Sequence, residues 1–232
     1  MIGALVVAGL LGAGGLIWLT GTGKNLLQSV HTDTAQDVSA IVASIHGGQT
    51  TITRGQLDEQ IHALAQNPQI QVPDASQKEE RTKFEHLVVD QMVRDRILFD
   101  EAQKQGFTAD DTAIDAQLTT ITEQYKDTAA FEQALAAAQL DRDALRENIR
   151  HQLVVDQYYK KITAEQTIAP TPEEIRAFYD QQIVPQQTAS TTIAFETVAD
   201  QIKTHLEQQK TQEVINGIVD GLYASAEVTI LI

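Results

Sequence analysis

The hydrophobic pattern divides the chain into an uninterrupted apolar N-terminal stretch and a longer region with helical periodicity. Residues 2–19 read IGALVVAGLLGAGGLIWL and contain no charged side chain. Because a helix rises about 1.5 Å per residue, a run of this length crosses a hydrocarbon core about 30 Å thick. The pattern therefore predicts a transmembrane anchor in residues 1–23, followed by a polar linker over residues 24–37.

A cleaved signal peptide is the alternative interpretation of residues 1–23. Signal peptides have a basic segment before the apolar run and a small-residue cleavage site after it. No Lys or Arg precedes the run, and no convincing A-x-A site follows it, so the anchor is favoured. Lys24 is the only basic residue nearby and leaves the orientation of the anchor poorly determined.

Short β-branched segments lie at both ends of the remaining region. Residues 40–45 (AIVASI) and 50–52 flank the turn sequence His46-Gly47-Gly48-Gln49, which predicts a small hairpin. Residues 227–232 (EVTILI) predict a final strand, and an unpaired strand of this composition promotes aggregation. We therefore expect the final strand to pair with the hairpin, so that the two ends of the region meet.

Between these ends, apolar positions at helical spacing predict a series of helices with recognisable starts. A Ser or Thr followed three residues later by Glu, Gln or Asp, or a single Asp, marks each start. The predicted starts are Thr53, Ser76, Thr108, Asp127, Asp141 and Thr171, and the last helix runs from about residue 195 to 224. The predicted fold is mainly α: a transmembrane helix, then a helical domain over residues 38–232 with a small antiparallel β element that joins its N- and C-terminal strands.

Composition excludes several kinds of chemistry. With 32 acidic and 17 basic residues the formal net charge is −15, which repels phosphate backbones and argues against nucleic-acid binding. Cysteine is absent, so no disulfide or thiol site is possible.

The sequence Gly21-Thr22-Gly23-Lys24 is not a phosphate-binding loop. That motif requires Gly at the position of Trp18 and Ser or Thr at the position of Asn25. We predict no catalytic, cofactor, nucleotide or metal site.

Aromatic residues are sparse, and the densest are Tyr158, Tyr159, Phe178 and Tyr179. Side chains of this kind at helix ends are more often core anchors than ligand contacts. A role in contacting a bound polypeptide is the alternative, and these four residues are the candidates for it.

Five segments, in order, resemble the SurA/PpiD/PrsA-type extracytoplasmic chaperones. They cover roughly residues 38–232, and it is their order and spacing together that make the resemblance specific. The segments are AIVASIHGGQTTITRGQLDEQI, LVVDQMVRDRILFDEAQKQGFTADDTAIDAQL, FEQALAAAQLDRDALRENIRHQLVVDQYYKKI, TPEEIRAFYDQQ and FETVADQIKTHLEQQKTQEVINGIVDGLYASAEVTILI. The resemblance implies a SurA N-terminal-like chaperone domain and an extracytoplasmic location.

The chain departs from this family at one place. Members commonly carry a parvulin prolyl-isomerase domain between the last two segments, whereas here only residues 182–194 lie there. A segment this short cannot form a folded domain. Isomerase activity is therefore not carried over, and we predict a protein that is not an enzyme.

The resemblance implies a membrane-anchored holdase that binds unfolded or newly secreted polypeptides without ATP. It would be a single-pass cell-membrane protein held through residues 2–19, with its soluble domain outside the cytoplasm. One alternative is a foldase related to prolyl isomerases with a degenerate or absent catalytic domain. The other is an assembly factor dedicated to one envelope partner.

Overall fold

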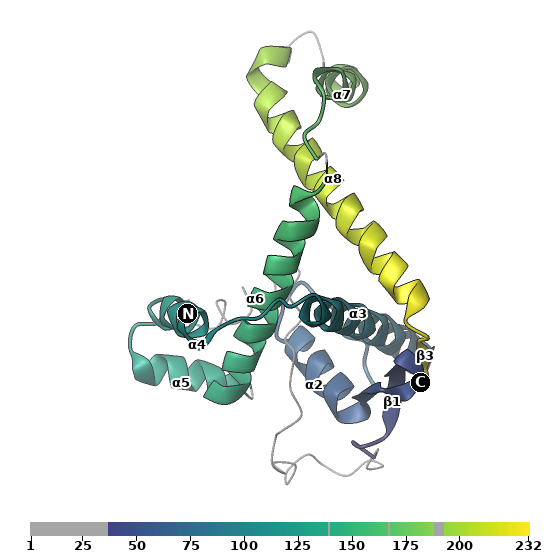
Figure 1. Cartoon of the computed structure of the whole chain (residues 1–232), viewed down its shortest axis with the longest axis vertical. Helices are drawn as coiled ribbons and strands as arrows, with labels where there is room; N and C mark the ends of the chain where they lie inside the picture. The colour runs from purple at the N-terminus through teal and green to yellow at the C-terminus, as the bar shows by residue number, and fades with distance from the viewer. Residues whose placement is uncertain (1–36, 139, 167, 188–192) are drawn as a thin grey trace. The chain divides into compact units, whose positions relative to one another are not determined.

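A computed structural model describes residues 37–138, 140–166, 168–187 and 193–232, which are mainly helical (Figure 1). The chain forms two compact units. Unit 1 contains the residues up to Gln157 together with Leu222–Ile232, and unit 2 contains Tyr158–Gly221. Each unit is described here by itself.

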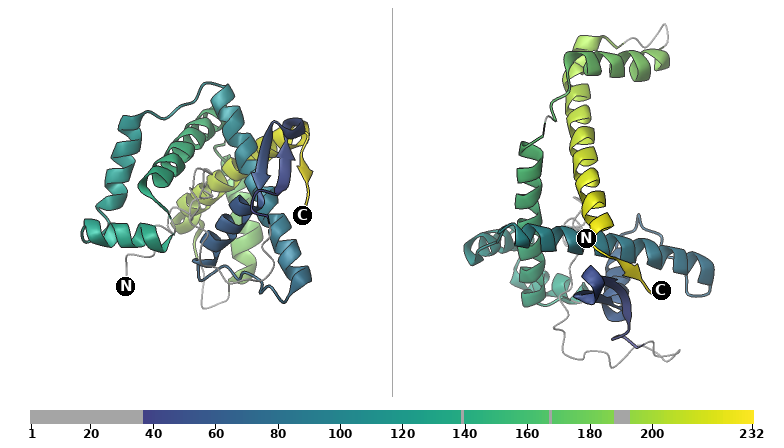
Figure 2. Two further views of the ribbon diagram at one scale, coloured as in Figure 1. Left: turned by 90° about the horizontal axis from the view of Figure 1, so that it is seen from below. Right: turned by 45° about the vertical axis from the view of Figure 1, so that its right-hand side comes forward.

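A three-stranded antiparallel sheet in unit 1 joins the two ends of the described chain (Figure 2). Its strands are β1 (Ile41–Ile45), β2 (Thr50–Thr53) and β3 (Thr229–Ile230), in the order β2-β1-β3. The 3-10 turn η1 (His46–Gly48) links β1 to β2, with Gly47 at φ 65° and Gly48 at φ 96°, where glycine carries no steric penalty. The predicted meeting of the chain ends is confirmed, because β1 pairs with β3.

The sheet packs on two helices, α2 (Arg54–Ala65) and α3 (Lys78–Lys104). α2 begins with the predicted capping box, in which the Thr53 side chain accepts from Gln56 N–H and the Gln56 side chain accepts from Thr53 N–H. Partly buried residues from the end of the chain complete this core. The sheet core comprises Val42, Ala43, Ile45, Ile52, Leu57, Ile61, Val88, Val89, Val93, Ile97 and Ala226, with Leu222, Tyr223, Val228, Ile230 and Ile232 packed against it.

An ion-pair network joins α2 to α3 beside the sheet core. Glu85 Oε2 accepts from Arg54 Nη1 at 2.7 Å and Glu85 Oε1 accepts from Arg81 Nε at 2.8 Å. Burial raises the pKa of Glu85. The hydrogen bonds and charges of the two arginines lower it by a larger amount, so this pKa lies below its ordinary value. The ionised carboxylate is therefore the form that the fold stabilises.

A second core lies in α4 (Asp111–Thr122), α5 (Thr128–Ala137) and the first part of α6 (Arg142–Ala164). Arginines at four-residue spacing on α6 pair with acids from the other two helices: Arg142 with Glu132 of α5, and Arg146 with Asp111 and Asp115 of α4. Because residues four apart share one helix face, this row holds α4 and α5 along the same side of α6.

Unit 2 consists of the end of α6, α7 (Pro172–Phe178), two short helical turns and most of α8 (Phe195–Ser225). The turns are the π-helix η2 (Tyr179–Ile183) and the 3-10 helix η3 (Val184–Gln186). Residues 182–186 of the predicted loop 182–194 are therefore helical.

Two of the predicted helix starts are wrong. Ser76 does not cap α3, because Asp74 Oδ1 accepts from Ser76 N–H at 2.9 Å and forms a local turn ahead of the helix. Thr108 does not cap α4, which is capped by the Asp110 side chain accepting from Ala113 N–H. Both errors have one physical cause, since an aspartate nearby competes for the backbone amides.

The transmembrane part of the predicted fold and the single-pass membrane localisation must be corrected. No helix within the described ranges is both long enough and apolar enough to cross a membrane. The longest helices, α3, α6 and α8, carry charged side chains along their length. Residues 2–19, to which the anchor was assigned, lie outside the described residues. The fold class is mainly α with a small three-stranded antiparallel sheet.

We predict that Glu85→Gln destabilises the fold in a pH-dependent way. A carboxylate whose pKa is lowered by folding stabilises the folded state above its ordinary pKa and loses this contribution as the pH falls. We expect the variant to lose about 1–2 kcal/mol of unfolding free energy at pH 7, the loss shrinking below about pH 4.5. Urea unfolding at pH 7 and at pH 3.5 measures both effects.

Glu79→Gln is the control for this experiment, because Glu79 forms an exposed pair with Lys83 on the same helix. We expect it to change the unfolding free energy by less than about 0.5 kcal/mol. Equal losses in the two variants, or a Glu85→Gln loss that does not vary with pH, would contradict the prediction.

Candidate functional site

The four aromatic candidates differ in how accessible they are. Tyr158 and Tyr179 are buried, with 3% and 7% of their surface exposed, whereas Tyr159 and Phe178 are half-buried. A buried ring cannot contact a bound polypeptide without rearrangement. Their contact with a polypeptide stays a prediction, and it is weaker for Tyr158 and Tyr179 than for the other two.

Phe178 and Tyr179 lie in an aromatic cluster where α7 meets α8 in unit 2. The Tyr179 ring meets the Phe195 ring edge-on, with centroids 5.3 Å apart, and the Phe178 ring lies 5.3 Å from that of His205. The Arg176 guanidinium lies 5.5 Å from the Tyr179 centroid and 5.0 Å from the Phe195 centroid. Cation–π and edge-on contacts of this kind stabilise packed rings, so the cluster has a structural role.

Polar contacts fix the same junction. The Tyr179 hydroxyl donates to the Ile193 carbonyl oxygen, and Gln187 Nε2 donates to that carbonyl at 2.9 Å. Lys210 Nζ of α8 donates to Glu174 Oε2 of α7 at 2.7 Å. This bond and the bond from Thr171 N–H lower the pKa of the Glu174 carboxyl. The junction therefore uses both the ring and the hydroxyl of Tyr179.

The accessible apolar surface is formed by aliphatic residues that are not among the four contact candidates chosen from the sequence. Leu87 on α3 is 71% exposed and Leu231 beside β3 is 59% exposed. Large aliphatic side chains this exposed lose contact with water when they meet apolar groups of a partner. The exposed large aliphatic residues of the described chain are Val38, Ile41, Leu87 and Leu231 in unit 1, and Val184 and Ile193 in unit 2.

The exposure of Leu87 could not be predicted from the spacing of apolar residues in the sequence. Val89, Val93 and Ile97 recur at four-residue spacing and are buried, so they define the inner face of α3. Leu87 falls outside this row, but buried Leu98 lies within about 20° of it around the helix, so spacing alone does not place Leu87 towards solvent.

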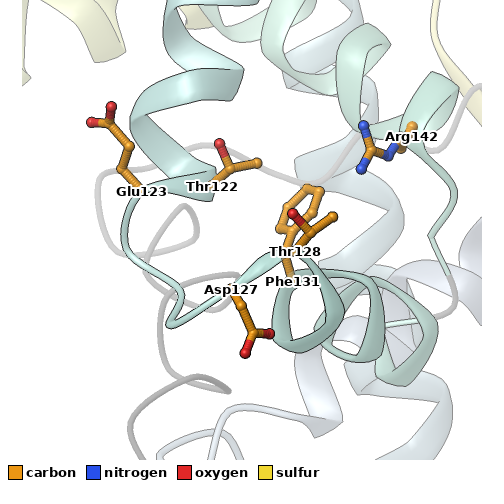
Figure 3. A pocket seen from close by; sticks show the side chains of 6 residues that line it. All are labelled: Thr122, Glu123, Asp127, Thr128, Phe131 and Arg142. Atoms are coloured by element: carbon orange, nitrogen blue, oxygen red, sulfur yellow. The ribbon is translucent and has the colours of Figure 1, made fainter.

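A small hollow in unit 1 lies where α4 ends and where α5 and α6 begin (Figure 3). The Phe131 ring forms part of its wall and is covered by the Arg142 guanidinium, 5.6 Å from the ring centroid. Asp127 accepts from Ala130 N–H at 2.8 Å as the cap of α5, and Arg142 pairs with Glu132. Two polar groups of the hollow are thus engaged structurally, Asp127 in capping α5 and Arg142 in pairing α6 with α5. Across the part of the chain that the structure describes, no group of three His, Asp or Glu side chains is placed to hold a metal ion.

A family model described as the SurA-like N-terminal domain matches residues 2–159, which is more than half of the chain. The chain belongs to this family. The resemblance inferred from the sequence is thereby confirmed. Only residues 187–194 separate η3 from α8, too few for an inserted parvulin domain.

Curated relatives of this SurA-like chain are named Chaperone SurA. The protein from Yersinia pestis bv. Antiqua (strain Antiqua) is 26% identical over 150 residues, which are 63% of this chain and 32% of that protein. The protein from Alkalilimnicola ehrlichii is 26% identical over 96 residues, 41% of this chain and 22% of that protein. The chain thus spans about a third or less of the length of these relatives.

We predict that Tyr179→Ala loosens the junction between α7 and α8 in this SurA-like chain. The variant loses the edge-on ring contact and the hydroxyl bond to Ile193, each worth about 1 kcal/mol. Backbone amides of α7 should therefore exchange with deuterium about tenfold faster or more, while amides of α2 and α3 keep their rates.

Tyr159→Ala is the matched control, because Tyr159 is a half-buried tyrosine of unit 2 outside this cluster. Unchanged exchange in α7 of the Tyr179 variant, or equal acceleration in both variants, would show that the cluster does not hold the junction.

Proposed function

We propose that the chain is a chaperone of the holdase type, which binds unfolded polypeptides and delays their aggregation without hydrolysing a nucleotide. The observation that carries the proposal is the match to the SurA-like N-terminal domain over residues 2–159. The relatives' name, Chaperone SurA, supports the same class of activity. Residues 38–232 are proposed as the chaperone domain.

The distribution of exposed aliphatic side chains supports broad and weak binding. These side chains are spread over α3, the sheet and the junction of α7 with α8 rather than gathered in one enclosed pocket. Separate small apolar contacts suit an unfolded chain, which presents its apolar residues at irregular intervals. Release would then follow from low affinity at each contact.

The acidic surface supports solubility during such binding. A net charge of −15 keeps complexes with partly apolar clients from associating with one another. That the chain is not an enzyme remains part of the proposal.

The test is light scattering of urea-unfolded citrate synthase diluted into buffer with an equimolar amount of the full chain. We expect the chain to delay aggregation, and Leu87→Ser to weaken the delay by about two- to fivefold because an exposed leucine contributes apolar contact area. Aggregation at the rate seen without the chain would refute the proposal.

The control variant is Gln91→Ser, one helical turn from Leu87 on α3 and also exposed. Both variants place serine on the same helix side, so their helix propensities change in the same direction. If Gln91→Ser weakens the delay as much as Leu87→Ser, the apolar character of Leu87 is not what binds the client.

A further inference from the structure

β3 is an edge strand that lacks the usual protection of edges. β3 lies on the outer side of β1, and in the described part of the chain no further strand pairs with it (Figure 2). Proteins commonly protect such an edge with Lys, Pro, a bulge or a covering element. Residues 228–232 (VTILI) contain none of these residues, and all five are β-branched or aliphatic.

The other edge of the sheet is formed by β2 and is less suited to an added strand. β2 continues directly into α2, and Thr53 N–H is already bonded to Gln56 Oε1 at 2.9 Å. Three of the four β2 residues are threonine. The edge formed by β3 is therefore the one suited to pairing with an apolar extended chain.

The hydrogen-bond pattern shows which backbone groups of β3 point outward. Leu231 N–H donates to the Val42 carbonyl of β1 at 2.8 Å, and Ala43 lies opposite Ile230. In an antiparallel pair, bonded and non-bonded residue pairs alternate. Ile230 therefore directs its N–H and C=O away from β1, towards the outer edge.

Side chains next to this edge offer apolar contacts on both faces. Ile230 is partly buried against the sheet core, so a residue added opposite it would extend that core. Leu231 is 59% exposed and lies on the other face, because side chains alternate along a strand. An added strand thus meets apolar groups at successive positions.

Charge favours a cationic occupant. Every arginine in the described residues is already paired with an acid, whereas Glu227, just before β3, is exposed. The paired arginines are Arg54, Arg81, Arg94, Arg96, Arg142, Arg146, Arg150 and Arg176. With a formal net charge of −15 and the exposed Glu227 directly before the strand, electrostatics favour an occupant that carries Lys or Arg over one that carries Asp or Glu.

We propose that the outer edge of β3 binds an extended segment of an unfolded polypeptide as a fourth strand, preferring segments that alternate aliphatic with basic residues. This site rests on the proposed holdase function and specifies the class of segment bound. Main-chain bonds to Ile230 supply affinity that depends little on sequence, and the exposed apolar side chains supply the preference.

The probe is a fluorescein-labelled twelve-residue peptide of alternating Val and Lys, titrated against the full chain by anisotropy. Ile230→Pro removes the outward N–H without removing a donor to β1, and we expect it to raise the Kd about tenfold.

Leu231→Lys should weaken binding similarly. Gln133→Lys adds the same charge to an exposed position of α5, outside the proposed contacts, and should leave the Kd unchanged. A peptide with Glu in place of Lys should bind more weakly.

Amide exchange supplies a readout that needs no variant. At peptide saturation the Ile230 amide should exchange at least tenfold more slowly, while the Leu231 amide, already bonded to Val42, changes little. This comparison and Leu231→Lys keep the test decisive if Ile230→Pro proves unstable in urea unfolding. An unprotected Ile230 amide at saturation, or wild-type Kd values for both edge variants, would overturn the proposal.

Other outcomes are also decisive. A dimer of the chain in sedimentation that Ile230→Pro abolishes and the peptide cannot displace would make a second copy the occupant and overturn the proposal. If the wild-type chain delays aggregation but its Ile230 amide stays unprotected, strand addition fails while the holdase function stands. If the peptide protects Ile230 but aggregation is not delayed, strand addition stands and the holdase function fails.

Discussion

The antiparallel pairing of β1 with β3 is the contact on which unit 1 depends. It joins segments from the two ends of the described chain, with Ala43 opposite Ile230, and all the helices of the described residues lie between them in the sequence. Closing a loop this long costs conformational entropy that grows only slowly with its length. Burial of Val228, Ile230 and Ile232 against the sheet core offsets that cost, since each removes apolar area from water. Because this contact is non-local, it is expected to form late in folding.

Local sequence signals predicted those parts of the fold that depend on neighbouring residues. The capping boxes at Thr53 and Thr171 and the Asp127 cap are present as expected, because each needs only a side chain and an amide three residues away. The starts at Ser76 and Thr108 were wrong for the same reason, since an aspartate close to each one forms a rival local bond. The pairing of the final strand with the hairpin was predictable, because an unpaired EVTILI segment promotes aggregation. Which residues lie opposite each other in that pairing was not predictable.

The candidate site was less predictable, because the type of a residue and its spacing along the sequence do not reveal how exposed its side chain is. Tyr158 and Tyr179 fit the interpretation of aromatic residues as core anchors, and both are buried. Tyr179 is also the first residue of the π-helical turn η2, and its ring meets Phe195 edge-on. The spacing of apolar and polar residues does not predict such a turn. The exposed aliphatic residues could not be identified as contact residues from the sequence, because a single exposed leucine is ordinary in any surface, and only the structure shows which ones lie on an open strand edge.

The course of α8 shows why a single amphipathic pattern is an incomplete description of this fold. Ile202, its buried residue, lies on the side that also carries Phe195, while Ile215 and Ile218 lie roughly 140–160° away around the helix. The apolar side therefore changes between the two halves. Near this change the surface is polar and is held by bonds within the helix, such as Gln209 Nε2 to Glu213 Oε1 at 3.2 Å. A helix of this kind does not need one continuous partner, because its first half packs on the α7 cluster and its last turn on the sheet core. Leu222 and Tyr223 thus place β3 directly after a helix end that is itself anchored in the core, so the strand edge is held by packing that does not depend on what pairs with it.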